Sequence, residues 1–269
     1  MKRLLLLIFP AFIWSVSFTS CDANDAELVF LSRQSAEELY KKLESAYKCS
    51  STKDLKKFFK EWNVSVSSNE DDFIKQNNVI EAIYEVYKEF YNPLDLTKLG
   101  DWEWGNSLNS NSQYVVVQNR IDFAVVEEEF FDMWFLIQNF DSICDFRPPL
   151  NLAKDKILYL TPEYKKSINM FLGTESTQMG ENGIMTPSLP QGESEKRYAF
   201  LRPNIPILHG HWGNYWHLAT HPEISHIVID KNTVAAKVLF RVGYQGGEAI
   251  LKKKSKGWTI EESRATWIE

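Results

Sequence analysis

The sequence predicts an α+β fold in which N-terminal helices pack on a curved, mostly antiparallel sheet that ends in a four-stranded C-terminal meander. Three observations support this prediction. Apolar residues recur with helical spacing in the first third of the chain. Four strand-like segments separated by turns fill the last fifty residues. The composition, 44% hydrophobic and 14% aromatic, is that of a globular protein.

The first third carries three amphipathic helical patterns. Ser35 and Glu38 have the spacing of a capping box, and an apolar stripe follows as far as Tyr47. A second stripe spans residues 55–62. The third begins at Val79 and ends before Pro93, because a residue that precedes proline avoids the helical region. We expect the aromatic residues of these stripes to face a core.

The middle of the chain has a mixed pattern. Residues 112–127 predict one or two strands, whereas residues 128–140 fit a helix or a strand. Residues 156–173 predict a short strand and then a helix that begins at Thr161-Pro162, since proline suits the first helical position. Residues 173–194 are polar and glycine-rich and predict a long loop.

The meander is predicted from four segments, residues 224–230, 233–244, 248–254 and 258–268. Side chains alternate between the two faces of a strand. In the second segment this alternation places Val238, Phe240, Val242 and Tyr244 on one face, and Lys237, Leu239 and Arg241 on the other.

Three helices followed by a meander that closes on "KGWTIEESRATWI" resemble the NTF2-like (SnoaL-like, cystatin-like) fold. The resemblance covers about residues 33–92 and 223–269. It implies a curved sheet that wraps a long helix and forms a conical pocket. Residues 100–210 are then a mixed elaboration, and we treat residues 33–269 as one α+β domain.

The N-terminus resembles a bacterial lipoprotein signal. Lys2 and Arg3 precede an apolar run over residues 4–14, and small or polar residues lead to Cys21. The resemblance implies that residues 1–20 are removed and that Cys21 is acylated. Residues 21–32 then form an acidic linker. The alternative is an ordinary secretory signal that is cleaved nearby and leaves Cys21 unmodified.

The segments "DLKKFFKEW", "YNP", "DFRP" and "FRVGYQGGEAILKKKSKGWTIEES" are similar to those of uncharacterised lipoproteins of Bacteroidota. This resemblance implies where the protein is located, but it does not imply an activity. It places the protein in the cell envelope, as an outer-membrane lipoprotein that faces the periplasm or the cell surface. The lipid bilayer is then a partner through acylated Cys21.

The net charge bears on nucleic-acid binding, and the cysteine content bears on disulfide formation. The net charge is −6 at pH 7, so the chain has no electrostatic footprint for nucleic acid. Besides Cys21, the chain holds Cys49 and Cys144. In an exported protein these two either form a disulfide or stay free and buried.

All five histidines lie between residues 209 and 226. His209 and His211 would share one face of a strand and make a usable pair of metal ligands. His217 and His221 have helical spacing, but Pro222 takes His221 out of a helix. The segment "HPEISH" lacks the spacing of a zinc-protease motif. We therefore expect no metal ion and no other cofactor.

The candidate binding residues lie in the segment that leads into the meander and on the strands of its sheet. They are His209, His211, His217, Arg241, Tyr244 and Glu248. The structural alternative for Arg241 and Glu248 is an ion pair across neighbouring strands.

No nucleophile-elbow, phosphate-loop or dinucleotide motif is present. The sequence therefore favours a module that binds a small molecule or an envelope protein. One alternative is a pocket enzyme with His211 or His217 as its base. A second is a structural component of an envelope complex.

Overall fold

The computed structural model describes residues 34–66, 68, 74, 77–100, 109, 111–175, 178–179, 185–186, 188–210, 213 and 215–268. The predicted signal, Cys21, the whole of the acidic linker and His211 lie outside these residues. None of the described helices has both the length and the apolar character that crossing a membrane requires.

The described α-helices are α1 (Ala36–Lys48), α2 (Thr52–Ser65), α4 (Asn78–Phe90), α6 (Pro162–Leu172) and α7 (Gln191–Leu201), and the 3-10 helices are η1 (Thr97–Leu99), η2 (Glu128–Leu136) and η3 (Lys154–Lys156). The strands are β1 (Val115–Gln118), β2 (Ile121–Val126), β3 (Asp141–Ile143), β4 (Ile157–Leu160), β5 (Gln178–Met179), β6 (Met185–Thr186), β7 (Ile207–His209), β8 (Trp216–Leu218), β9 (Glu223–Asp230), β10 (Ala235–Val242), β11 (Gln245–Lys254) and β12 (Gly257–Ile268).

The largest sheet has six strands in the order β12-β11-β10-β9-β2-β3. All its pairs are antiparallel except β2 with β9. Strands β9 to β12 follow one another in sequence and form the predicted meander. The α+β fold class is confirmed.

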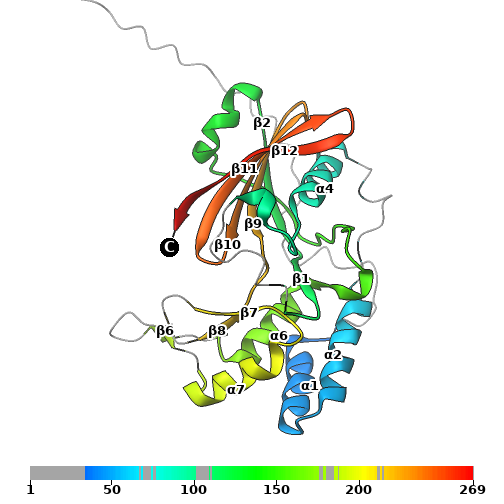
Figure 1. Ribbon diagram of the computed structural model, residues 1–269, viewed down its shortest axis with the longest axis vertical. Helices are drawn as coiled ribbons and strands as arrows, with labels where there is room; N and C mark the ends of the chain where they lie inside the picture. Colours follow the sequence, from blue (N-terminus) through cyan, green and yellow to red (C-terminus); the bar gives the residue numbers. More distant parts are fainter. Residues whose placement is uncertain are drawn as a thin grey trace, which may run out of the picture.

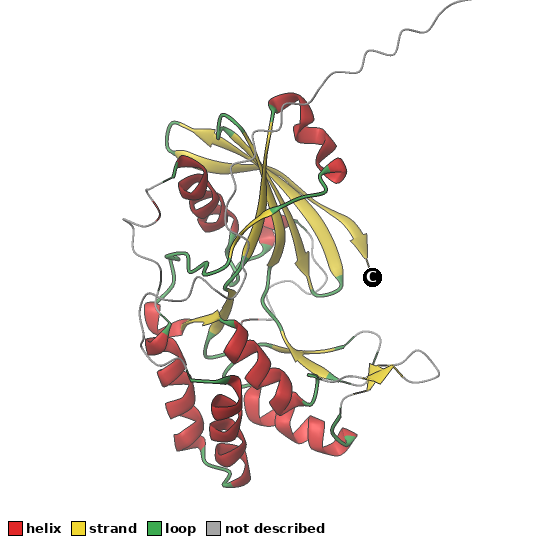
Figure 2. Cartoon of the chain, turned by 180° about the vertical axis from the view of Figure 1, so that it is seen from behind, coloured by secondary structure: helices red, strands yellow, loops and turns green. Residues whose placement is uncertain are grey.

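One face of this sheet packs on α4 (Figures 1 and 2). The predicted alternation along β10 holds, because Val238, Phe240 and Val242 are buried in this core. Phe90 of α4 meets Phe240 with ring centroids 4.8 Å apart. Tyr244 leaves the pattern, because Gly243 before it takes a φ of 58° and turns the chain.

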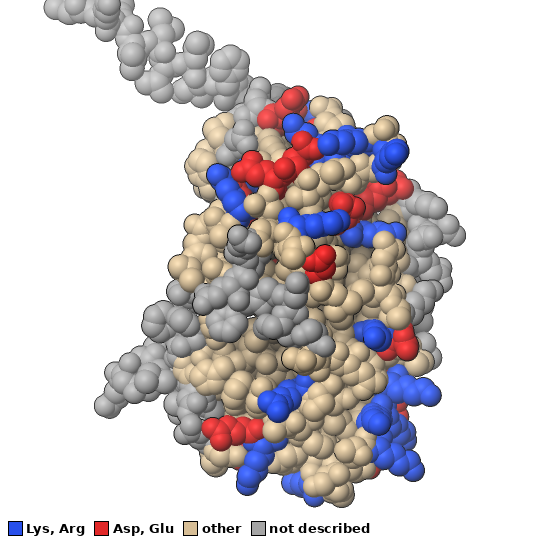
Figure 3. Space-filling model, viewed as in Figure 1, with Lys and Arg blue, Asp and Glu red and all other residues tan. Residues whose placement is uncertain are grey.

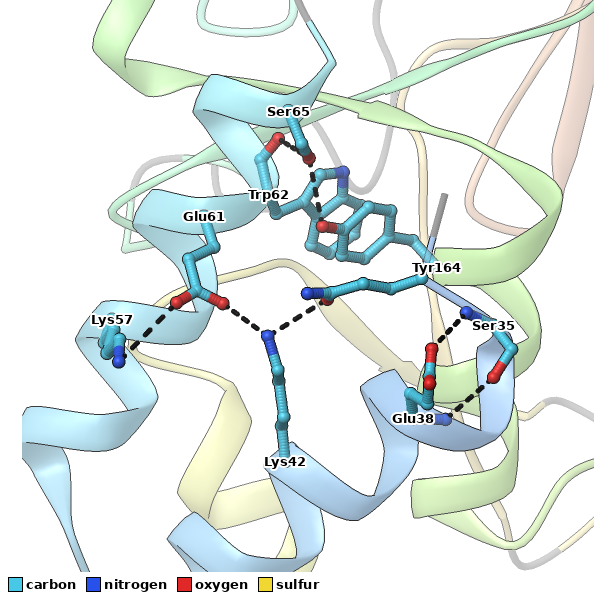
Figure 4. Close-up of polar contacts among 9 residues, drawn as sticks. Ser35, Glu38, Lys42, Lys57, Glu61, Trp62, Ser65 and Tyr164 are labelled. Carbon is cyan, nitrogen blue, oxygen red and sulfur yellow. Dashed lines mark hydrogen bonds and ion pairs between the residues drawn. The ribbon is translucent and has the colours of Figure 1, made fainter. Parts of the chain in front are cut away.

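Helices α1 and α2 do not cover this sheet; they belong to a second core with α6 and α7, seen as the lower part of Figure 1. The predicted capping box forms between Ser35 and Glu38 (Figure 4). Trp62 of α2 stacks on Tyr164 of α6, with ring centroids 4.2 Å apart and planes 5° apart. At the surface, Lys42 bonds Glu61 at 2.7 Å.

Strands β1 and β4 form a parallel pair that lies between the two cores. Val115 and Val117 face the core of the six-stranded sheet, whereas Tyr114 and Val116 face the helical core. On β4, Tyr159 faces the core of the six-stranded sheet and Leu158 faces the helical core. The run "VVV" is therefore buried on both faces, which explains why it shows no polar alternation.

Side chains donate hydrogen bonds to the backbone carbonyl groups at the outer edges of the β1–β4 pair. The indole N–H of Trp62 donates to the Tyr159 carbonyl at 2.9 Å, and the Asn63 amide donates to the Ile157 carbonyl at 2.8 Å. On the other edge, the Tyr91 hydroxyl donates to the Val116 carbonyl at 3.4 Å. Buried backbone groups need such partners, so these bonds let a two-stranded ladder sit inside the protein.

Two parts of the middle region were not predicted. The segment expected to be one long polar loop ends in α7, whose first turn contains Gly192 and therefore gives a weak helical signal. The short strands β7 and β8 are also new. Cys49 is exposed and free, so the predicted Cys49–Cys144 disulfide is wrong, and so is the alternative of two buried free thiols.

Arg197 of α7 joins three helices of the second core. Its side chain is 7% exposed and forms ion pairs with Glu44 of α1 at 2.7 Å and with Glu193 at 2.9 Å. It also donates to the Phe171 carbonyl of α6 at 3.0 Å. The guanidinium carbon lies 4.8 Å from the centroid of the Phe171 ring.

We predict that Arg197→Met lowers the free energy of unfolding by about 3 kcal/mol, because it removes the buried cation of the Glu44 carboxylate and leaves it only the exposed Lys48 ammonium, 3.2 Å away. The double variant Arg197→Met/Glu44→Met should recover most of this loss. Lys166→Met is the matched control, since the Lys166–Glu37 pair is exposed and solvent screens its attraction, so this variant should be nearly as stable as the wild type. Urea denaturation followed by tryptophan fluorescence measures all three. A double variant no more stable than Arg197→Met would contradict the role of the ion pair.

Candidate functional site

The histidine segment forms an antiparallel ribbon of β7 and β8. Its register pairs His209 with Trp216 and Leu208 with His217. Residues that face each other across strands share one face of the ribbon, so His209 and His217 point to opposite faces. The two do not converge in one site, and His211 lies outside the described residues.

His209 connects the ribbon to the six-stranded sheet. Its backbone carbonyl accepts a hydrogen bond from the Tyr244 hydroxyl, at the turn between β10 and β11. Its ring meets the Trp216 ring edge-on, with centroids 4.9 Å apart. Tyr244 therefore joins the six-stranded sheet to the β7–β8 ribbon by a hydrogen bond.

His217 lies on the other face of the ribbon. Its ring packs beside Tyr215, with centroids 5.8 Å apart. Its Nδ1 atom lies 3.2 Å from the Leu218 carbonyl oxygen. His217 is also near enough to His221, which precedes β9, to lower the pKa of that residue.

His221 is the histidine that sequence reasoning undervalued. It is 5% exposed, and its Nδ1 accepts a hydrogen bond from the Gly243 N–H at 3.4 Å. Its carbonyl accepts from the Asn109 amide at 3.3 Å. With Nδ1 as acceptor, the proton lies on Nε2, which has no hydrogen-bond partner in the described part of the chain. Burial, and then the neighbouring His217, lower the pKa of His221 to about 4.

Pro222 is the sequence feature that could have pointed to His221 as a buried residue. Pro222 excludes His221 from a helix, and it lies just before β9, where the chain enters the sheet. The remaining histidine, His226, packs on Phe140 with ring centroids 4.1 Å apart, and burial lowers its pKa. It is a sheet histidine, as its place in "ISHIVID" suggested.

Arg241 and Glu248 do not pair with each other. The guanidinium of Arg241 donates to the Gly243 carbonyl at 2.7 Å and lies over the Trp267 ring, 5.8 Å from its centroid. Glu248 is buried and accepts from Arg264 of β12 at 2.8 Å. The predicted ion pair is wrong, because the register places Arg241 opposite Gly246 and Glu248 opposite Arg264.

Gly246 makes room for the Trp267 ring. A Cβ atom at residue 246 would lie 1.9 Å from the indole of Trp267, so any larger residue would displace that ring. Arg241, Trp267 and the Glu248–Arg264 pair thus form a packed layer on the sheet face opposite α4. The layer is a structural assembly rather than an open pocket.

A cavity of about 490 Å³ lies where α7 ends and β7 begins. It is lined by Asn111, Ser112, Tyr198, Arg202, Pro203, Ile205, Pro206, Ile207 and Leu208. Two backbone bonds hold its walls together: the Gln113 N–H donates to the Pro203 carbonyl at 3.1 Å, and the Tyr114 N–H to the Asn204 carbonyl at 2.8 Å. The cavity therefore sits directly before β1.

An aromatic stack borders this cavity. The Tyr198 ring stacks on the Trp216 ring, with centroids 3.7 Å apart and planes 9° apart. The Arg202 guanidinium lies over Tyr198, 5.5 Å from its centroid. His209 is the predicted residue nearest to it in sequence, since it follows Leu208 on β7 and contacts Trp216.

The cavity combines an apolar wall with three polar side chains, Asn111, Ser112 and Arg202. Such a mixture is typical of sites that bind small molecules. His217, Arg241, Tyr244 and Glu248 are not among its lining residues. Within the described ranges, no three His, Cys, Asp or Glu side chains gather in a way that would hold a metal ion.

We predict that His221 makes stability depend on pH. Its pKa is about 4 in the folded chain, below the ordinary value of 6.5. The unfolded chain therefore takes up a proton first as the pH falls, and stability is lost between about pH 6.5 and 4. The shift corresponds to about 3 kcal/mol.

Urea denaturation at pH 7.5 and pH 4.5 tests this for the wild type, for His221→Asn and for His209→Asn, an exposed control. His221→Asn should lose less stability than the wild type over this interval, whereas His209→Asn should behave as the wild type does. An equal loss in all three would show that His221 is not the titrating group.

In comparisons with protein-family models, with curated proteins and with solved structures, the chain matches none significantly.

Proposed function

We propose that the protein is an exported, lipid-anchored protein of the cell envelope whose folded part binds a small molecule in the cavity beside α7 and β7. The observation that carries the binding role is this cavity of about 490 Å³ with Tyr198 and Arg202 in its wall. Its volume is in the range of small-molecule sites.

The lining side chains favour a class of ligand. Ile205, Ile207 and Leu208 offer an apolar wall, while Asn111 and Ser112 offer hydrogen bonds. Arg202 is exposed and donates in a planar fork that suits carboxylate or phosphate groups. We infer a ring compound that carries an anionic group or several hydroxyl groups.

The proposed location rests on the sequence of residues 1–27, which resembles a lipoprotein signal and the acidic linker that follows it. The arrangement of α4 against the meander supports an NTF2-like origin of the sheet part. The cavity that we propose lies outside that part, in the elaboration between residues 100 and 210. The binding role therefore does not depend on a conical pocket in the sheet.

We predict that a thermal-shift screen with aromatic acids and sugar acids yields compounds that raise the melting temperature. At a hundred times the Kd, binding contributes about 2.7 kcal/mol, which is roughly 5–10 °C for a chain of this size. Arg202→Met should weaken the affinity at least about tenfold, because a hydrogen bond to a charged group contributes about 1.5–3 kcal/mol.

The matched control is Arg120→Met, which changes an exposed arginine of the sheet part. It should bind as the wild type does. Compounds that bind Arg202→Met and wild type equally well would rule out this cavity as their site. If a compound is turned over and His217→Ala abolishes that turnover, the pocket enzyme replaces the binding module.

We predict that Cys21→Ser releases the protein from the membrane fraction, because acyl chains contribute about 0.8 kcal/mol per buried methylene. Cys49→Ser is the control and should stay in that fraction, since Cys49 is an exposed free thiol. Mass spectrometry of the mature N-terminus should find the acyl mass on Cys21. A Cys21 thiol without acyl chains, or one bound to Cys144, would contradict the anchor.

A further inference from the structure

Arg202 brings a positive charge to the cavity beside α7 and β7. Arg120, Arg147, Arg197 and Arg264 each form an ion pair with an aspartate or a glutamate. In the part of the chain that the structure describes, Arg202 contacts no carboxylate. A ligand in the cavity can therefore supply a negative charge to this guanidinium.

The charge of the cavity is small. Arg202 is the one charged side chain among the nine described residues that line it. On the face drawn in Figure 3, charged side chains are sparse around β7 and β8 and frequent towards both ends of the molecule. A single guanidinium balances one negative charge, which a carboxylate carries at pH 7, whereas a phosphate monoester carries about 1.5 to 2. The cavity therefore favours a monocarboxylate over a phosphate.

Tyr198 holds the guanidinium of Arg202 in place from one helical turn earlier on α7. The Arg202 Cζ atom lies 5.5 Å from the centroid of the Tyr198 ring, and its Nη1 atom lies 3.5 Å from the Tyr198 hydroxyl oxygen. A cation is attracted to the face of an aromatic ring, so these contacts restrict a long side chain that has several rotamers. A restricted guanidinium loses less conformational entropy when it binds a carboxylate.

Tyr198 is fixed in turn by a row of rings that leads to the six-stranded sheet. Trp216 of β8 stacks on Tyr198 with ring centroids 3.7 Å apart and planes 9° apart. His209 of β7 meets Trp216 edge-on, with ring centroids 4.9 Å apart. The His209 carbonyl accepts the hydrogen bond from Tyr244 that joins the ribbon to the sheet. The position of Arg202 therefore depends on contacts that extend beyond α7.

The same stack argues against a sugar as the ligand. Trp216 stacks on one face of the Tyr198 ring at 3.7 Å, which leaves only the other face for the Arg202 guanidinium. Neither face is then open for a sugar ring to pack on. Among the described lining residues, Asn111 and Ser112 are the only uncharged polar side chains besides Tyr198. Hydroxyl groups that lose water need hydrogen-bond partners, and a sugar acid has more of them than these two side chains can serve.

We propose that the cavity is specific for a monocarboxylic acid with an apolar body, and that Tyr198 is a positioning residue for this site. The Arg202 guanidinium binds both carboxylate oxygens in parallel hydrogen bonds. Pro203, which is exposed, and Leu208, which is half-buried, contact the apolar body. This inference rests on the proposed binding role of the cavity and narrows the class of its ligand.

Isothermal titration calorimetry of the purified chain tests the ligand class with acids and their own amides. Benzoate and hexanoate are compared with benzamide and hexanamide, which have the same apolar body and no charge. At least one acid should bind about tenfold more tightly than its amide, because a hydrogen bond between charged groups is stronger than one to a neutral group. That acid should also bind more tightly than glucuronate and phenyl phosphate.

Variants of Tyr198 test the positioning role. Tyr198→Leu removes the ring beside the guanidinium and should weaken the binding of the acid about threefold, while the amide binds as before. Tyr198→Phe keeps the ring and should restore the affinity for the acid. Phe200→Leu is the matched control, because Phe200 is a half-buried ring of α7 that packs on Tyr47 and Phe171 and is not among the lining residues. Equal weakening of acid and amide by Tyr198→Leu would show a structural role and overturn the positioning role.

The outcomes separate the ligand class from the proposed binding role. Equal binding of the acids and their amides would overturn the monocarboxylate class but would leave the cavity as a binding site. Tighter binding of glucuronate or phenyl phosphate than of either acid would overturn it in the same way. If none of these compounds binds, the monocarboxylate class is wrong, and the thermal-shift screen with Arg202→Met decides on the binding role by itself.

Discussion

The structure depends on a two-stranded parallel ladder that is buried on both faces. Strands β1 and β4 send alternate side chains into two different cores, with Val117 on one side and Val116 on the other. Neither core is complete without this wall. Its edges would expose backbone groups inside the protein, and Trp62, Asn63 and Tyr91 remove that cost by bonding its outer carbonyls.

The wall also explains where the candidate site lies. The chain enters β1 through Gln113 and Tyr114, whose N–H groups bond the segment after α7. This contact places residues 111–112 opposite residues 203–208 and opens the cavity between them. On the far side, the chain returns to the sheet through His221, whose imidazole bonds the β10–β11 turn. The site is thus set by the junction of the two parts and not by the sheet alone.

Local patterns predicted much of the fold. The capping box at Ser35, the helix begun at Pro162 and the whole meander depend on nearby residues, and they formed as expected. The division of the helices between two cores depends on long-range contacts, which no periodicity encodes. The site was predicted less well. Glu248 was expected in a pocket, but a strand register that the sequence does not specify gave it Arg264 as a partner.

Differential scanning calorimetry of the mature chain shows whether the two cores unfold together, because a wall shared by both cores must couple their unfolding. We expect one transition whose calorimetric and van't Hoff enthalpies agree. We also expect that Val116→Ala and Val117→Ala each shift that single transition to a lower temperature. Two separate transitions, each moved by only one of these substitutions, would show that the β1–β4 pair does not couple the cores.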